Sequence, residues 1–91
     1  MRIEWDDVAL QDRERIFEFL YPINPLAAEQ VDDEIELTIE LLLEKPEMGR
    51  PWHGEARKLV ISKASLLLIY VILDEVIRIL AIAHQREKFP N

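Results

Sequence analysis

Three apolar runs in the second half of the chain decide the fold. They are Arg57-Lys-Leu-Val-Ile-Ser62, Leu66-Leu-Leu-Ile-Tyr-Val-Ile72 and Val76-Ile-Arg-Ile-Leu-Ala-Ile-Ala-His84. Many of their residues are Val or Ile, whose branched Cβ favours a strand over a helix. Lys63-Ala64-Ser65 and Asp74-Glu75 separate the runs and are short enough to connect neighbouring strands. The sequence therefore predicts an antiparallel meander of three strands.

A short strand and a helix are predicted at the start of the chain. Met1–Trp5 alternates apolar and charged residues, as a strand with one buried face does. The helix should run from about Val8 to Leu20, with Asp6 and Asp7 as N-cap candidates. Tyr21-Pro22 should end it, because Pro cannot continue a helix.

A second helix is predicted from Asn24-Pro25, an N-cap followed by Pro at the first helical position, to about Lys45. Because few residues join the two helices, they should form an antiparallel hairpin. The expected fold class is α+β in the order β-α-α-β-β-β, with one sheet covered by the hairpin on one face. Residues 1–91 should make a single domain, because so short a chain cannot support two cores.

Composition excludes several classes of protein. The chain has no Cys, which excludes disulfides and thiolate metal sites, and no apolar run reaches the ~20 residues of a membrane span. We therefore expect a soluble, cytoplasmic protein. The net charge of −7 is unevenly divided, since residues 1–48 carry 14 acidic and 4 basic residues while residues 49–91 carry 4 acidic and 7 basic ones. Only the second half could attract nucleic acid.

No metal or cofactor is expected. Two His without Cys make a zinc site improbable. The carboxylates of the second helix are spaced as on the solvated face of an amphipathic helix. The two Gly residues, Gly49 and Gly54, do not form a loop that could cradle a phosphate.

Seven fragments together give the chain a family resemblance. They are Leu10-Gln-Asp-Arg-Glu-Arg-Ile-Phe17, Asn24-Pro25-Leu-Ala-Ala-Glu-Gln30, Leu41-Leu-Leu-Glu-Lys-Pro46-Glu-Met-Gly49-Arg50-Pro51, Arg57-Lys-Leu-Val-Ile61, Leu67-Leu-Ile-Tyr70, Val76-Ile-Arg78-Ile-Leu80 and His84-Gln-Arg86-Glu-Lys-Phe-Pro90. In this order the chain resembles the ParE/RelE superfamily of type II toxins, and ParE (plasmid stabilisation) more than RelE. It departs from the family at Phe89, where Trp is frequent, at Glu87, where a basic residue is frequent, and at Val71, where many members have Arg.

The resemblance implies a toxin that arrests growth by inhibiting DNA gyrase and that is not itself an enzyme. It also implies a ParD-like antitoxin that neutralises the toxin in a hetero-oligomer. The target-binding residues would be Arg57, Arg78, Arg86, Lys88 and Phe89. An aromatic anchor flanked by cations is the residue combination typical of interface hot spots.

The antitoxin should bind apolar residues that the hairpin leaves uncovered. The expected contacts are Ile16, Phe17, Leu20 and Leu41. A disordered antitoxin segment that folds on docking could cover them, along the groove between helix and sheet or around the hairpin.

Two alternatives remain open. A ribosome-dependent mRNA endoribonuclease, as in RelE, could use His84 as base and Arg57, Arg78 and Arg86 to hold phosphate. Residues 78, 84 and 86 would share one side of the last strand if that strand is regular, although the absence of Arg after Tyr70 weakens this reading. A toxin fold that has lost activity and serves only as a binding module is the other alternative.

Overall fold

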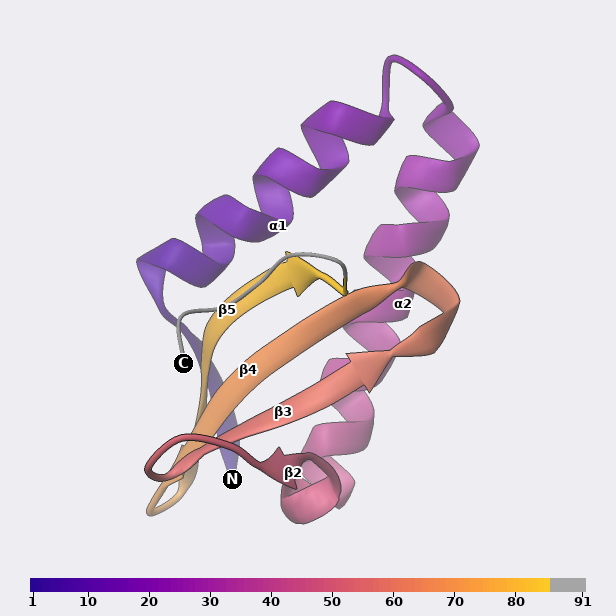
Figure 1. Cartoon of the computed structure of the whole chain (residues 1–91). Coiled ribbons are helices and arrows are strands. Elements are labelled where there is room, and N and C mark those ends of the chain that lie inside the picture. Colours follow the sequence, from indigo (N-terminus) through magenta and orange to yellow (C-terminus); the bar gives the residue numbers. More distant parts are fainter. Residues whose placement is uncertain (86–91) are drawn as a thin grey trace.

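Two helices cover one face of a five-stranded sheet in a computed structural model that describes residues 1–85 (Figure 1). In chain order the elements are β1 (Arg2–Trp5), α1 (Asp7–Leu20), α2 (Pro25–Glu44), the 3-10 turn η1 (Pro46–Met48), β2 (Arg50–Pro51), β3 (Ala56–Ile61), the 3-10 turn η2 (Ser62–Ala64), β4 (Leu66–Leu73) and β5 (Val76–His84). This confirms the α+β class and the helical hairpin. No helix in this part of the chain is long and apolar enough to cross a bilayer.

The sheet has the order β1-β5-β4-β3-β2 and is mixed. The expected antiparallel meander is formed by β3, β4 and β5. Two details differ from the prediction. β1 joins the sheet parallel to β5, and the segment after η1, expected to be irregular, contributes the two-residue strand β2 beside β3. The parallel pairing is possible because residues 6–75, which include the helical hairpin and the strands β2, β3 and β4, provide the long connection that parallel strands require.

The helix ends follow local sequence signals. Asn24 accepts a hydrogen bond from the Ala27 backbone N–H (3.1 Å), so it caps α2 as predicted. Asp6 occupies the N-cap position of α1, which begins at Asp7, one residue earlier than expected. Its carboxylate makes no capping hydrogen bond with that helix.

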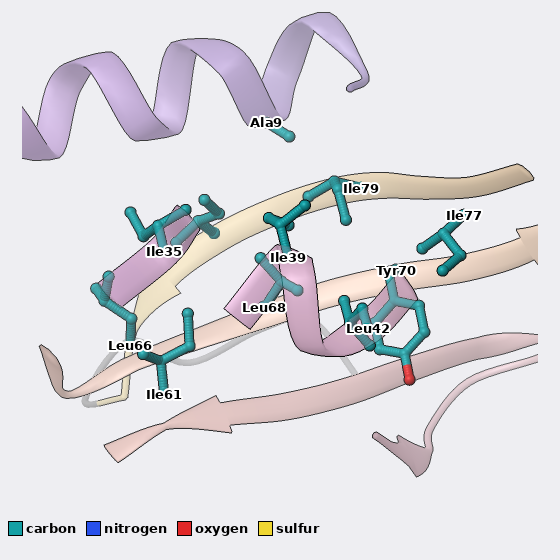
Figure 2. Packing of buried hydrophobic residues seen from close by; sticks show 11 residues of the cluster. Ala9, Ile35, Ile39, Leu42, Ile61, Leu66, Leu68, Tyr70, Ile77 and Ile79 are labelled. Carbon is teal, nitrogen blue, oxygen red and sulfur yellow. The ribbon is translucent and has the colours of Figure 1, made fainter. Parts of the chain in front are cut away.

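The core lies between the sheet and both helices (Figure 2). α2 contributes Ile35, Ile39 and Leu42, as its apolar stripe predicted, whereas the buried apolar residue of α1 is Ala9. The strands contribute Ile61, Leu66, Leu68, Tyr70, Ile77, Ile79 and Ile82. A typical buried Leu or Ile contributes about 2 kcal/mol through removal from water, so this cluster is the main source of stability.

A bulge interrupts β5. Ile69 is opposite Ala81, but Tyr70 is opposite Ile79, so Leu80 has no partner on β4. An extra residue reverses the faces of all later side chains in a strand. The prediction that residues 78 and 84 share a side was conditional on a regular strand and is therefore wrong.

Buried Asp12 satisfies the backbone beyond this bulge. β1 ends at Trp5, opposite Ile79, and so does not reach Ile82. The Ile82 N–H instead donates to Asp12 Oδ2 (3.0 Å), while Arg15 Nη2 donates to Asp12 Oδ1 (2.7 Å). Only 8% of Asp12 is exposed. The sequence pattern gave no sign of this role, because an acidic residue in α1 is expected to face solvent.

Candidate binding surfaces

Arg57 lies on the helix-covered face of the sheet. It is opposite buried Tyr70 in the β3–β4 pair, and residues directly opposite each other share a face. Its Nη1 donates to the carbonyl oxygens of Gly49 (2.7 Å) and Glu47 (3.3 Å), and its Nη2 is 3.8 Å from Glu47 Oε1. The guanidinium is therefore used largely to fix the loop that follows α2.

Tyr70 fixes the same loop from within the core. Its hydroxyl donates to the Pro46 carbonyl oxygen (2.6 Å) and accepts from the Gly49 N–H (2.8 Å). A Cβ added at Gly49 would be 2.7 Å from Tyr70 Cε1, so only Gly permits this approach. Burial raises the pKa of Tyr70. Figure 2 shows the hydroxyl directed away from the apolar cluster. We call Arg57, Tyr70 and residues 46–49 the loop clamp.

Arg78 lies on the other face of the sheet. It is opposite Val71, and Val71 lies one position after Tyr70 and therefore faces away from the helices. Arg78 is exposed, and its Nη2 is 3.8 Å from Glu4 Oε1 on the neighbouring β1. An exposed ion pair at this distance contributes little to stability, which leaves the guanidinium available for another contact.

His84 lies on the helix-covered face because of the bulge. It is opposite Leu66, a core residue, and borders a cavity with Ile16 and Leu20. Leu66 and Tyr70, the partners of His84 and Arg57, are four residues apart on β4. At about 3.3 Å per residue, His84 and Arg57 are separated by about 13 Å along the sheet.

The structure therefore does not bring the predicted cations together. Arg57 and Arg78 are on opposite faces, and His84 is at the far end of the sheet from Arg57. Arg86, Lys88 and Phe89 lie outside the described residues 1–85.

Two hollows adjoin the hairpin and hold most of the predicted antitoxin contacts. One, the α2–β3 groove, has a volume of about 500 Å³ and includes Leu41. The other, the α1 cavity, has a volume of about 440 Å³ and includes Ile16 and Leu20. Phe17 lies elsewhere, on the side of α1 where it stacks on Tyr21 (5.5 Å between ring centroids).

Sequence reasoning missed several residues of these hollows. Phe19 is 69% exposed at the α1 cavity, and Leu37 is 51% exposed at the α2–β3 groove. The available signal was the spacing of Leu37 and Leu41, because apolar residues four apart and off the buried stripe form a second apolar row on a helix.

The acidic face of α2 is partly used inside the molecule. Arg13 Nε donates to Asp32 Oδ1 (2.7 Å), and Arg13 Nη2 is 3.1 Å from Glu36 Oε2. The hydrogen bond to Asp32 is the main reason that the pKa of Arg13 is raised. The guanidinium also lies over the Trp5 ring, 5.3 Å from its centroid. Among residues 1–85 no group of His, Asp and Glu has the arrangement of a metal site.

Known proteins resemble this chain in sequence pattern and in fold. The family model described as the ParE toxin of the type II toxin-antitoxin system parDE matches residues 3–89. The chromosomal ParDE system of P. aeruginosa contains a chain with 22% identity and a TM-score of 0.82, with 92% of this chain and 95% of that chain covered.

Two E. coli structures are similar at lower scores. A chain of the intact RelBE toxin-antitoxin complex has 16% identity and a TM-score of 0.70, with 93% and 96% of the two chains covered. The isolated RelE toxin has 14% identity and a TM-score of 0.68, with 94% and 85% covered. No curated protein sequence matches significantly. At these identities the structural likeness establishes the fold alone.

Proposed function

Because this chain belongs to the ParE toxin family of type II toxin–antitoxin systems, we propose that it is a toxin that a ParD-like antitoxin neutralises and that inhibits DNA gyrase when free. The observation that carries this proposal is the family match over residues 3–89. Gyrase and antitoxin would both be met in the cytoplasm, where we therefore expect the protein to act. Growth arrest would follow from blocked supercoiling.

The antitoxin would bind at the α2–β3 groove and the α1 cavity. These hollows contain Leu37, Leu41 and Phe19, large apolar side chains that are roughly half or more exposed. Contiguous exposed apolar side chains of this kind indicate a protein-binding surface. An antitoxin that occupied both hollows would cover the two sides of the hairpin, which supports a hetero-oligomer.

The gyrase contact would come from the far face of the sheet and the C-terminal tail. Arg78 is exposed on that face, and Arg86, Lys88 and Phe89 are the cationic and aromatic residues of the tail. Arg57 would act indirectly, by holding the loop clamp. A protein target suits a chain whose first 48 residues are strongly acidic, because those residues would repel DNA.

The arrangement supports gyrase over a ribonuclease. Cleavage of mRNA requires a base and phosphate-binding cations around one phosphodiester. His84 and Arg57 are about 13 Å apart along the sheet, and Arg78 is on its other face. The described residues thus hold no such cluster.

A supercoiling assay tests the proposal. Purified protein should inhibit gyrase or accumulate cleaved DNA, and Arg78→Ala should reduce this potency about tenfold, the effect of losing about 1.4 kcal/mol of binding free energy. Lys45→Ala, an exposed cation at the end of α2, is the matched control and should have no effect. A chain ending at Gln85 tests the contribution of the tail.

Codon-positioned mRNA cleavage on ribosomes, with no effect on gyrase, would replace gyrase inhibition by the ribonuclease function. If neither activity is present and expression of the chain does not slow growth, the binding-module alternative replaces both.

A further inference from the structure

The α1 cavity differs from other hollows of the molecule in its charge. Its lining contains two basic side chains, Arg15 and His84, and within residues 1–85 no Asp or Glu borders it. Three other hollows are bordered by carboxylates, which are Glu34, Glu40 and Glu44 in the α2–β3 groove, Asp33 and Glu34 in a hollow next to that groove, and Glu14, Glu18 and Asp32 between α1 and α2. In a chain of net charge −7, a cavity without carboxylates is the place where an anionic ligand would meet least repulsion.

The apolar walls of the cavity come from both helices, from η2 and from β4. Leu66 is a core residue, and Ile16 and Val31 pack against the core, so these three side chains form the inner part of the cavity. Phe19 is 69% exposed and therefore lies at the mouth. The volume of about 440 Å³ lies within the range of about 300–1,000 Å³ that is typical of sites for small molecules. An apolar group of that size can be removed from water here.

Arg15 is held in position beside this cavity. Its Nη2 donates to Asp12 Oδ1 (2.7 Å), and Asp12 is fixed in turn because its Oδ2 accepts from the Ile82 N–H (3.0 Å). A guanidinium has five N–H donors, so the bond to Asp12 does not use all of them. The Arg15 side chain is 69% exposed, whereas Asp12 is 8% exposed and is not part of the cavity lining. A second carboxylate can therefore approach Arg15 from the cavity and form a charge-assisted hydrogen bond.

His84 borders the same cavity from the end of β5. It is opposite Leu66, and the bulge at Leu80 is what turns its side chain to the helix-covered face, where the cavity lies. An imidazole carries an N–H donor in either protonation state. The cavity therefore combines apolar walls with two side chains that can donate to an anionic oxygen.

From these features we propose that the α1 cavity binds a small apolar carboxylate, of the class of medium-chain fatty acids and arylcarboxylates. The apolar part of the ligand packs on Ile16, Val31 and Leu66. Its carboxylate accepts hydrogen bonds from Arg15 and His84. Because the antitoxin is proposed to occupy the same cavity, the carboxylate and the antitoxin would exclude each other, and this consequence alone rests on the proposed function.

The test uses three probes that share one alkyl chain and differ in the head group, namely octanoate, 1-octanol and octylammonium. Titrated into the full chain with ¹³C-labelled methyl groups, octanoate should shift the methyl signals of Ile16, Val31 and Leu66. It should bind at least about tenfold more tightly than octylammonium. This order is opposite to the one that the net charge of −7 alone would produce. The proposal is overturned if octanoate does not bind, if it shifts signals only elsewhere, or if octylammonium binds as tightly.

A first pair of variants tests the head-group contact. Arg15→Gln should weaken octanoate binding about tenfold but change 1-octanol binding less than about twofold, because the apolar walls remain. Arg2→Gln is the matched control, since the Arg2 side chain is 68% exposed and also binds a carboxylate, that of Glu4 (3.1 Å), but does not line the cavity. Retained binding of 1-octanol shows that the Arg15 variant is folded. Equal octanoate affinities of the two variants contradict the proposal.

A second pair of variants locates the apolar part of the ligand. Phe19→Asp should weaken octanoate binding at least about tenfold, because it removes an apolar wall and adds a like charge at the mouth. Ile23→Asp should have no effect, since Ile23 is 70% exposed, as Phe19 is 69% exposed, but lies outside the lining. Equal losses would contradict the assignment of the site. These titrations involve neither gyrase nor the antitoxin, so their failure and that of the toxin function are separately visible.

Discussion

The loop clamp and the α2–β3 groove lie at neighbouring parts of the boundary between α2 and β3. They differ in whether their backbone N–H and C=O groups have partners within the molecule. In the clamp, Tyr70 and Arg57 bind the backbone groups of Pro46, Glu47 and Gly49. In the groove, the backbone edge at Val60 has no strand beside it in the described chain. A surface whose polar groups are satisfied internally contributes to the fold, and one that leaves them open is available to a partner.

The largest effect is expected where the clamp is tightest. Gly49→Ala should lower the free energy of unfolding by about 3 kcal/mol, because its Cβ would lie 2.7 Å from Tyr70 Cε1 and 2.8 Å from the Tyr70 hydroxyl oxygen. Gly54→Ala is the control, since a Cβ there meets nothing within 4 Å and the cost is the backbone strain of φ +56°, about 1 kcal/mol. Urea denaturation measures both. Equal losses would mean that the clamp is not tightly packed.

Removal of the Tyr70 hydroxyl should have the next largest effect. Tyr70→Phe leaves the Pro46 C=O and the Gly49 N–H without their partner, and a loss of about 2 kcal/mol is expected. Tyr21→Phe, at a residue that is 48% exposed, should change stability by less than about 0.5 kcal/mol. A Tyr70→Phe variant as stable as the wild type would show that water replaces the hydroxyl.

A smaller effect is expected at high pH. Burial raises the pKa of Tyr70 above its ordinary value of 10.0, so the folded state holds the phenol proton more tightly than the unfolded state. The stabilisation that comes from this raised pKa is fully present below pH 10. It is lost as the pH rises from about 10 through the higher pKa of Tyr70 in the folded state. The difference in free energy of unfolding between wild type and Tyr70→Phe should therefore shrink over that range. A constant difference would contradict a raised pKa.

The smallest effect on stability is expected in the groove. Leu41→Ala should change the free energy of unfolding by less than about 0.5 kcal/mol. Leu42→Ala, at the next residue, should cost about 3 kcal/mol because that side chain is 0% exposed. Thermal unfolding of the two variants compares an open surface with the core. A large loss for Leu41→Ala would mean that the groove is part of the fold and not a binding surface.

The helices and the meander were predictable because they depend on local signals, and the family was predictable because fragments along the whole chain resemble its members. Asn24 and Pro25 start α2, Pro46 ends it, and the Val and Ile runs form strands. The expected likeness to ParE more than to RelE is confirmed by the family match and by TM-scores of 0.82 for the ParDE chain and 0.70 for the RelBE chain. The roles assigned to Arg78, Arg86, Lys88 and Phe89 stay predictions.

The grouping of site residues was not predictable, because it depends on one backbone irregularity. The bulge at Leu80 turns His84 to the helix-covered face while Arg78 remains on the other face. No residue near Leu80 marks a bulge in the sequence, since Ile and Ala on either side are compatible with a regular strand. The hydrogen bond from the Ile82 N–H to Asp12 was not predictable for the same reason, because Ile82 lies beyond this bulge.

The sequence by itself determined the order of elements and the buried stripe of α2, because propensity, capping and periodicity act over a few residues. It also determined the family, through fragments that resemble known toxins in the same order along the chain. Tertiary structure alone decided which cations face which side of the sheet, that Arg57 holds a loop, and that Val60 lies beside an open groove. Those properties depend on register between strands distant in the sequence, and a shift of one residue is enough to reverse them.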